Sequence, residues 1–428
     1  MFKYLIIALM RKGTILYIHP LGEHPNNNDN FYLNKSLNRI IIKKPQKYYS
    51  FIPMGIIGAI NNLIKNRFKV AGIDLPLKKT LYNFDFESFL KSKANYSIFL
   101  IDIHWYVHLK NGVETAKAIK KHLPNSRIII GGMTATIFYK DLIKMPFIDF
   151  IIKGDCEQPL LRLLKNIDVS KKLIDIPNLV TKQVDNPIAY ASFDIDKYDY
   201  TDISWMEDYR QYIDMCNFWL LTAKGCPFNC KICDGNREHY QTMYIINKMI
   251  IRSPDVITTD IANLEHKTEF VNLSHDIALL GEDVIDKILK KKYNVGLYNE
   301  FFQLPSKELL QKLSNSFLSL ELVFTLISGS NRERREFGKS FTNREFLKLL
   351  RYIKTLNFNG GIIIYFTDYM ISQLEIKKLN AKKTAKLIKK IKKIYPYAQI
   401  EIMPQLVDPL CVMKEHNVSS DVLFKTYF

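Results

Sequence analysis

Three cysteines stand close together in the middle of the chain, at Cys226, Cys230 and Cys233. Thiolates are soft ligands that suit zinc or iron–sulfur clusters. At these spacings one loop can bind three irons of a cubane [4Fe–4S] cluster. Because no fourth cysteine follows nearby, one iron would stay open to a reactant. The sequence therefore predicts a cluster that takes part in chemistry.

A zinc site is the alternative for the same thiolates, with His239 as the fourth ligand. Structural zinc sites usually combine two closely spaced pairs of ligands, and the sequence has no second pair of cysteines. The spacing therefore favours the cluster. The alternative from another functional class is an iron–sulfur electron carrier or sensor without enzymatic activity.

The cysteine segment resembles the C-x₃-C-x₂-C signature of the radical S-adenosylmethionine (radical SAM) superfamily, and the resemblance extends over residues 220–410. It implies that Cys226, Cys230 and Cys233 bind the cluster and that the open iron chelates S-adenosylmethionine (SAM). One-electron reduction would then give methionine and a 5′-deoxyadenosyl radical, which abstracts hydrogen from the substrate. Ile232 departs from the superfamily, where an aromatic residue usually precedes the third cysteine.

Residues after the later strands are expected to contact SAM. Ser274 follows a strand where the superfamily often carries a Gly-Gly-Glu-like segment, and those glycines are absent here. Glu300 is expected near the ribose. Ser328, Arg334 or Arg335 is expected near the carboxylate, and the alternative for the two arginines is a solvated helix start. The expected cofactor contacts of this half are Phe228, Ile232, Ser274, Glu300 and Ser328.

Short apolar strands alternate with amphipathic helices in residues 14–165, which indicates a parallel, doubly wound α/β sheet. Ligands of such sheets bind beyond the carboxyl ends of the strands. The predicted strands are Ile15–Ile18, Phe68–Asp74, Tyr96–Ile103, Arg127–Ile130 and Phe150–Ile152, and the predicted helices include Ile56–Lys65 and Val113–His122.

The alternation returns after residue 217 and predicts six βα units, too few for a full eight-fold barrel. We expect a doubly wound domain at 1–165, a linker at 166–217, a partial (βα)₆ TIM-like barrel at 218–410 and a tail at 411–428. The lysine-rich segment Lys377–Lys393 is predicted to be one solvated helix. The predicted barrel strands are Phe218–Thr222, Phe270–Leu273, Gly296–Tyr298, Ser319–Leu326, Gly361–Phe366 and Gln399–Met403.

The first half resembles the Rossmann-like cobalamin-binding domain that precedes many radical SAM domains, through segments 51–63, 70–74, 128–134 and 149–157. A Gly131-Gly132 turn after a strand lets the backbone approach a bulky nucleotide tail. A dinucleotide is disfavoured because no G-x-G-x-x-G follows the first strand. The remaining alternative is a related domain that binds no cobalamin. The expected contacts are Pro53, Gly55, Asp102, His104, Gly131, Gly132, Thr134 and Gly154.

Asp102 and His104 look like the start of a D-x-H-x-x-G motif, whose histidine binds cobalt in other cobalamin proteins. Val107 stands at the glycine position, and radical SAM relatives normally lack that ligand. We therefore expect this pair to line the cobalamin or substrate site, with a buried core histidine as the alternative. His19 and Glu23 are expected near the lower cobalt face. The other cysteines, Cys156, Cys216 and Cys411, are expected to be structural thiols.

These resemblances together imply a cobalamin-dependent radical SAM enzyme, most simply a methyltransferase acting on an unactivated carbon. By the family's mechanism, the 5′-deoxyadenosyl radical activates the substrate and methylcobalamin donates the methyl group. Ring formation or rearrangement is the alternative within the family. Methylthio transfer is disfavoured because the N-terminal cysteine triad of such enzymes is absent. The sequence does not define the substrate, which we expect to be a small molecule, lipid or peptide.

Composition sets the class and compartment. The chain has 428 residues, is 47% hydrophobic and 12% aromatic, which excludes a disordered protein. Its net charge is +18, but the lysines are spread along helices, so we expect an acidic flavodoxin or ferredoxin as electron donor rather than nucleic acid. The apolar run Phe2–Met10 is too short to span a bilayer, and clustered cysteines suit a reducing compartment. We expect a cytoplasmic protein without a transmembrane segment.

Overall fold

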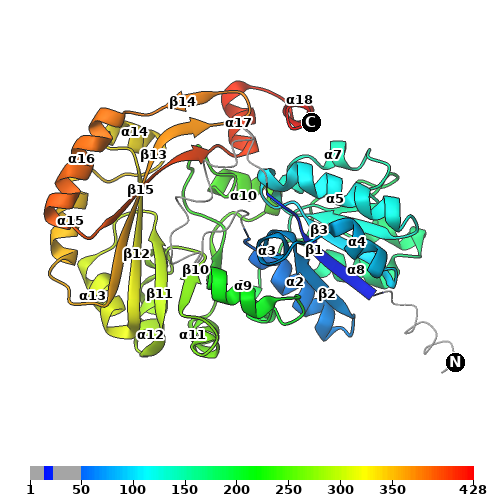
Figure 1. Ribbon diagram of the computed structural model, residues 1–428, viewed down its shortest axis with the longest axis horizontal. Helices are drawn as coiled ribbons and strands as arrows, with labels where there is room; N and C mark the ends of the chain where they lie inside the picture. Colours follow the sequence, from blue (N-terminus) through cyan, green and yellow to red (C-terminus); the bar gives the residue numbers. More distant parts are fainter. Residues whose placement is uncertain (1–13, 23–49) are drawn as a thin grey trace.

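Two sheets with their helical layers make up this computed structural model, which describes residues 14–22 and 50–428 (Figure 1). The first sheet has the strand order β2-β1-β3-β4-β5-β6 and is parallel except for the last pair. Its alternating side chains pack on both faces, because Ile15 and Tyr17 join one core cluster while Leu16 and Ile18 join another. The strands are β1 Thr14–His19, β2 Val70–Asp74, β3 Tyr96–Asp102, β4 Arg127–Gly131, β5 Phe150–Ile152 and β6 Leu179–Val180.

Helices cover both faces of this sheet, as a doubly wound arrangement requires. Two helices, α2 (Met54–Lys65) and α8 (Glu157–Asn166), pack against each other in the first core cluster. The second cluster includes side chains from the remaining helices of this half. They are α3 Leu75–Leu81, α4 Phe86–Ser92, α5 Leu109–His122, α6 Met133–Ile137 and α7 Tyr139–Leu142.

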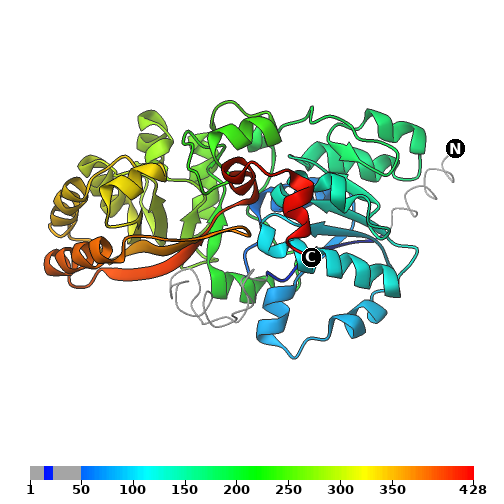
Figure 2. The ribbon, with the colours of Figure 1, turned by 90° about the horizontal axis from the view of Figure 1, so that it is seen from above.

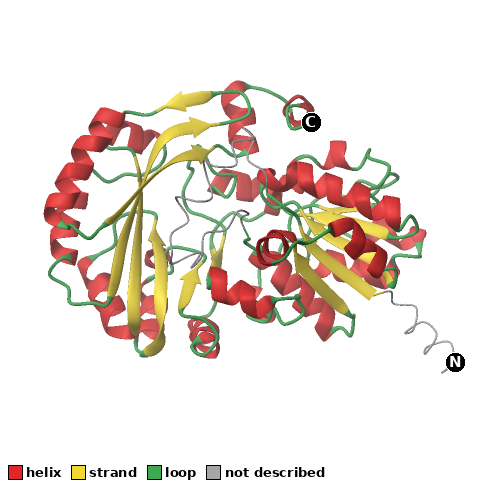
Figure 3. Cartoon of the chain, in the orientation of Figure 1, coloured by secondary structure: helices red, strands yellow, loops and turns green. Residues whose placement is uncertain are grey.

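The second sheet contains six parallel strands that neighbour one another in chain order, from β7 to β15. They are β7 Phe218–Leu220, β10 Phe270–Leu273, β11 Tyr293–Phe301, β12 Phe317–Ile327, β13 Gly360–Ile371 and β15 Gln399–Leu406. Helices lie on the outer side of this curved sheet (Figures 1 and 3). They are α11 Pro254–Leu264, α12 Glu282–Leu289, α13 Lys307–Ser316, α15 Asn343–Ile353 and α16 Ala381–Ile394.

The two faces of the second sheet carry different side chains. On the helix-covered face, Leu320 and Leu322 join the large core cluster. On the opposite face, called the inner face below, Val323, Tyr298 and Tyr365 form a separate cluster. Because successive side chains of a strand point to opposite faces, these alternating positions separate the helix-covered face from the inner face.

The prediction of one helix over Lys377–Lys393 was wrong at its start. Residues Ile376–Lys378 form β14, which pairs antiparallel with the end of β13. Helix α16 begins only at Ala381, where the Asn380 side chain accepts a hydrogen bond from the Lys383 amide. The lysine pattern suits a solvated strand as well as a solvated helix, and pairing with the preceding strand across a short turn made this segment a strand.

The segments expected as linker and tail both pack on the first sheet. Residues 166–217 supply β6 and α9 (Tyr209–Cys216), and Gly72 of β2 exchanges backbone hydrogen bonds with Trp205 and Glu207. The last helices, α17 (Pro409–His416) and α18 (Ser420–Lys425), return to the first half of the molecule (Figure 2). There the rings of Phe424 and Tyr427 lie 5.4 and 5.7 Å from that of Phe138. None of the described helices is long and apolar enough to cross a membrane.

Candidate functional site

The three cysteines lie in one loop between β8 (Ala223–Lys224) and α10 (Arg237–Tyr244), and all three are partly buried. Backbone contacts hold the loop in a closed curve. The Arg237 amide donates to the Phe228 carbonyl at 2.8 Å, and the Gly235 amide donates to Cys233 Sγ at 3.2 Å. The loop therefore presents three thiols from one short, ordered segment.

Two residues at the end of β10 hold the start of this loop. His275 Nε2 lies 2.9 Å from the Gly225 carbonyl oxygen, directly before Cys226. Burial lowers the pKa of His275 to about 4, so the ring is neutral. Nε2 then carries the proton that it donates to Gly225, while Nδ1 accepts from the Ser274 hydroxyl at 3.1 Å. Ser274, an expected SAM contact, thus lies next to the cysteine loop.

Lys339 places a positive charge beside the thiols, and the sequence reasoning missed it. Its side chain is buried, and its ammonium lies 5.4 Å from the centre of the Phe302 ring. Burial raises the pKa of Cys226 and Cys230, and the Lys339 ammonium opposes that shift. A cation here suits anionic thiolates or the carboxylate of a bound amino acid. Nothing in the local sequence distinguishes Lys339 from the many other lysines of the chain.

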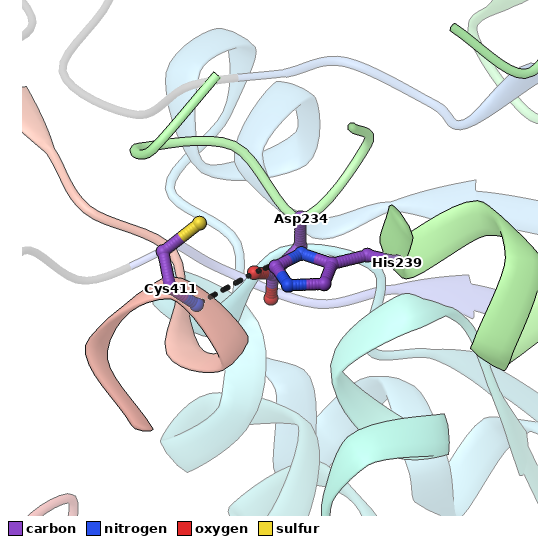
Figure 4. A group of neighbouring side chains, drawn as sticks. All are labelled: Asp234, His239 and Cys411. Atoms are coloured by element: carbon purple, nitrogen blue, oxygen red, sulfur yellow. Dashed lines mark hydrogen bonds and ion pairs between the residues drawn. The ribbon is translucent and has the colours of Figure 1, made fainter. Parts of the chain in front are cut away.

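His239 is not positioned as a fourth ligand to the three cysteines. It lies in a separate buried group with Asp234 and Cys411, whose ligand atoms are all within 4.8 Å of one another (Figure 4). The Asp234 carboxylate in this group accepts hydrogen bonds from the Leu410 and Cys411 amides at the start of α17. The group therefore ties the cysteine loop to the C-terminal helices.

The other expected SAM contacts differ in their accessibility. Glu300 is half-buried and accepts a hydrogen bond from Thr325. Ser328 is fully buried, and its hydroxyl is engaged with Glu333 and the Ser330 amide. Phe228 and Ile232 are half-buried within the loop. The Ser328 hydroxyl is thus occupied by contacts that shape the turn after β12.

Both expectations for Arg334 were wrong. The side chain is fully buried, so it is not a solvated helix start. Its guanidinium donates to the Leu326, Ser328 and Phe341 carbonyls, which leaves it to stabilise the chain around α14 (Asn331–Glu336) rather than to bind a carboxylate. Arg335 is exposed, as a solvated helix residue would be.

A cleft with about 1150 Å³ of open space lies at the carboxyl end of the first sheet. All the residues expected to contact cobalamin line it, except Thr134. Thr134 is buried, and its hydroxyl donates to the His104 carbonyl at 3.0 Å. The opposite wall comes from the second half of the chain and was not foreseen from the sequence. It includes Leu221, Ala223, Lys224, Tyr240, Tyr244 and His275.

Gly132 fits this cleft for a steric reason. Its φ is +108°, and a Cβ atom there would lie 2.7 Å from the Ile103 carbonyl carbon and oxygen. Only glycine adopts this backbone readily. The turn after β4 therefore packs closely against the chain at Ile103, after β3, and its backbone atoms line the cleft.

The polar groups of the cleft form two sets. In the first set, Lys224 pairs with Asp155, and the nearby Glu157 Oε2 has no hydrogen-bond partner among the described residues. Burial raises the pKa of Glu157 to about 7 against the opposing charge of Lys224. The second set is Asp102 and His104, at and just after the end of β3. Burial lowers the pKa of His104 to about 4, so its ring is neutral.

His19 lies behind the cleft rather than in it. Its Nδ1 is 2.9 Å from Asp102 Oδ1, and the Tyr17 hydroxyl donates to the same carboxylate oxygen at 2.6 Å. Glu23 and the run Phe2–Met10 lie outside the described residues. Cys156 lines the cleft, Cys216 and Cys411 are buried, and all six cysteines are free thiols.

No protein-family model matches the chain. Among curated proteins, it is 22% identical over 275 residues to the hopanoid C-3 methylase of Methylococcus capsulatus, covering 60% of this chain and 51% of that protein. It is 25% identical over 263 residues to the anaerobic magnesium-protoporphyrin IX monomethyl ester cyclase of Cereibacter sphaeroides, covering 56% and 42%. The chain thus spans about half the length of the curated relatives that it matches.

Solved structures share the fold. The radical SAM methyltransferase TsrM from Kitasatospora setae, solved with cobalamin and a [4Fe–4S] cluster, matches with a TM-score of 0.62 at 12% identity, covering 92% of this chain and 72% of that one. The cobalamin-dependent radical enzyme OxsB, solved with aqua-cobalamin and SAM, matches with a TM-score of 0.57 at 15% identity, covering 97% and 55%.

The solved structures agree with the resemblance at the level of the fold. The chain has a mixed α/β fold with parallel sheets, similar to that of cobalamin-dependent radical SAM enzymes.

Proposed function

We propose that this protein is a cobalamin-dependent radical SAM enzyme that transfers a methyl group to an unactivated carbon. The observation that carries the proposal is the shared boundary of the two candidate cofactor sites. His275 lines the cleft of the first sheet and also binds the Gly225 carbonyl that begins the cysteine loop. A methyl donor in the cleft and a radical source on the loop would therefore be neighbours.

The domain assignment follows from this proposal. Residues up to 165 would form the Rossmann-like cobalamin-binding domain, and 218–410 the partial (βα)₆ radical SAM barrel. The order β2-β1-β3-β4-β5 supports the first assignment, since open α/β sheets bind ligands where the strand order reverses. Six parallel strands with helices on one side support the second. Residues 166–217 and 411–428 would connect the two domains.

The residues of the loop suit an iron–sulfur cluster. The three thiols Cys226, Cys230 and Cys233 would bind three irons, and Lys339 would balance part of the negative charge. When bound, the cluster with SAM supplies the radical and cobalamin supplies the methyl group. Ser274 and His275 join the start of the loop to the end of β10. Glu300 would contact SAM from the neighbouring strand β11.

The residues of the cleft suit a large ligand with a polar tail. The flat turn at Gly131 and Gly132, together with Gly154, leaves backbone groups accessible, and Pro53 and Gly55 line the same space. A neutral His104 can donate or accept one hydrogen bond without adding charge. These residues would hold a cobalamin between the two halves of the chain that line the cleft and would exclude water from it.

The test uses the full chain, reconstituted anaerobically with iron, sulfide and a cobalamin. Addition of dithionite and SAM should release methionine and 5′-deoxyadenosine, and the absorbance spectrum should show a corrinoid band. Cys230→Ala should reduce 5′-deoxyadenosine to background while the corrinoid band persists. If wild-type protein with an intact cluster releases no 5′-deoxyadenosine, the proposed radical chemistry is wrong. If the corrinoid band is absent, the cobalamin assignment is wrong.

The compartment and electron donor are further parts of the proposal. Six free thiols support a reducing compartment such as the cytoplasm. The exposed lysines of α16, among them Lys382, Lys386 and Lys390, support docking of an acidic flavodoxin or ferredoxin. Reduction of the cluster by such a donor should slow as ionic strength rises.

A further inference from the structure

A row of side chains crosses the inner face of the second sheet in register. Asn272 of β10 pairs with Trp219 of β7 on one side and with Tyr298 of β11 on the other. Tyr298 pairs with Glu321 of β12, which in turn pairs with Gly361 of β13. Five neighbouring strands thus bring an indole, an amide, a phenol and a carboxyl group into one line.

Three members of this row have buried polar atoms without hydrogen-bond partners in the part of the chain that the structure describes. Asn272 is 0% exposed, and neither atom of its amide is satisfied. Glu321 is 7% exposed with Oε2 unpartnered, and Trp219 Nε1 is also unpartnered. Proteins pair nearly all buried polar groups, because each unmade bond costs about 1–3 kcal/mol. A run of three such residues indicates groups that a ligand is meant to satisfy.

The carboxyl group of Glu321 lies in a space left by a glycine, and no positive charge among the described residues lies close to it. A Cβ atom on Gly361 would lie 2.8 Å from Glu321 Oε2, so glycine at this position leaves the space that the carboxyl needs. Burial raises the pKa of Glu321 to about 7, and no cationic side chain among the described residues lies close enough to oppose that shift. The chain as a whole carries a net charge of +18, yet none of that positive charge from the described residues reaches this acid. Glu321 could therefore bind a cationic ligand.

Aromatic rings flank the polar groups. The rings of Trp219 and Tyr298 lie 5.7 Å apart at 66°, and Tyr365 belongs to the same small cluster. A half-buried second acid, Glu401, pairs with Tyr365 from β15. Aromatic faces beside carboxylates favour organic cations, since both attract positive charge.

We propose that this row is the substrate-recognition site, and that the substrate carries a protonated amine that pairs with Glu321. A neighbouring amide or hydroxyl group of the same molecule would satisfy Asn272, with its carbon skeleton against Trp219 and Tyr298. The inference rests on the proposed function, because the row begins on β7, the strand that leads to the cysteine loop. It narrows the substrate to amine-bearing molecules.

The test measures binding of three aromatic amines and their alcohol counterparts to the reconstituted full chain by calorimetry. The pairs are benzylamine and benzyl alcohol, 2-phenylethylamine and 2-phenylethanol, and tryptamine and tryptophol. We expect at least one amine to bind roughly tenfold or more tightly than its alcohol, as a charge-assisted hydrogen bond implies. Glu321→Gln should remove this preference. Glu282→Gln, an exposed change on the outer helix α12, should keep it.

Two outcomes would overturn the proposal. One is that no amine binds more tightly than its alcohol, or that Glu321→Gln leaves the preference unchanged. The other is that the bound amine competes with SAM, which would make the row a SAM contact. Glu282→Gln lies outside the row and should retain 5′-deoxyadenosine release without substrate within about twofold of wild type. Absence of that release in wild type would contradict the proposed function while leaving the amine result interpretable.

Discussion

Buried carboxyl groups occur on both sheets of this protein, but their surroundings differ. On the first sheet, Asp102 accepts hydrogen bonds from Tyr17 and pairs with His19. On the inner face of the second sheet, Glu321 Oε2 has no partner among the described residues. Burial alone would raise the pKa of either acid. For Asp102 the neighbouring His19 and Tyr17 reverse that effect, and its pKa is lowered, whereas the pKa of Glu321 is raised.

This difference indicates that Asp102 has a structural role, whereas Glu321 has a role in binding. The carboxylate of Asp102 is satisfied by the protein itself, so the end of β3 keeps its shape whether or not the cleft is filled. The carboxyl group of Glu321 destabilises the folded chain until something supplies a donor. Buried polar groups that violate the usual pairing are expected where a protein binds something. One substitution tests the turn that forms the cleft, and two others test this contrast.

The largest expected effect is at the turn that forms the cleft. Gly132→Ala forces a Cβ atom against the Ile103 carbonyl at a φ that alanine avoids. We expect a loss of at least about 3 kcal/mol in stability and no corrinoid binding. The measurements are the urea midpoint followed by circular dichroism and the corrinoid absorbance after reconstitution.

Gly55→Ala is the matched control, because Gly55 lines the same cleft and an added Cβ would meet nothing within 4 Å. It should leave the urea midpoint unchanged or slightly raised, since alanine is the better helix residue. Equal effects of the two substitutions would contradict the steric account of the turn.

Local sequence patterns were sufficient for much of the fold. The strands at Phe150–Ile152 and Phe270–Leu273 were predicted with their observed bounds because each is a short apolar run. The strand predicted at Gly296–Tyr298 instead extends over Tyr293–Phe301. Polar residues such as Asn294 interrupt its apolar run, but hydrogen bonds to two neighbouring strands keep it extended.

The candidate sites were predictable only where they follow one segment of chain. The cysteine loop and the Gly131-Gly132 turn are local motifs: the loop follows β8, and the turn follows β4 and lines the cleft. The second wall of the cleft and the inner-face row depend on register between distant strands, such as Tyr298 opposite Glu321. A single glutamate between two leucines carries no local signal of this role.

The second expected effect concerns the paired acid. Asp102→Asn removes the charge that His19 needs and should lower stability by about 3 kcal/mol. Burial alone would lower the pKa of His19, but Asp102 raises it above 6.5. The pair therefore stabilises the fold fully between the ordinary aspartate pKa of 3.8 and pH 6.5. The stabilisation decreases as pH rises through the folded-state pKa of His19, or falls through the lowered pKa of Asp102. Urea midpoints across pH check this, with exposed Asp283→Asn as control.

The smallest expected change in stability is a gain rather than a loss. It tests most directly the difference between Glu321 and Asp102. Glu321→Gln should stabilise the ligand-free protein by about 1–2 kcal/mol at neutral pH, because the amide removes a buried charge but is itself left unpartnered. The folded state raises the pKa of Glu321 from 4.5 to about 7, so it binds the proton more tightly than the unfolded chain does. Wild type should therefore lose stability relative to the variant as pH rises from 4.5 to 7, and no further above it.

Urea midpoints of wild type, Glu321→Gln and Glu282→Gln at about pH 5 and about pH 8 measure this difference. The two variants should diverge at the higher pH and agree more closely at the lower one. If Glu321→Gln instead destabilises the protein at both, as Asp102→Asn is expected to do, then Glu321 is a paired structural acid. That result would contradict the proposed role of Glu321 in substrate binding, because a carboxyl group that stabilises the ligand-free protein is already satisfied without a ligand.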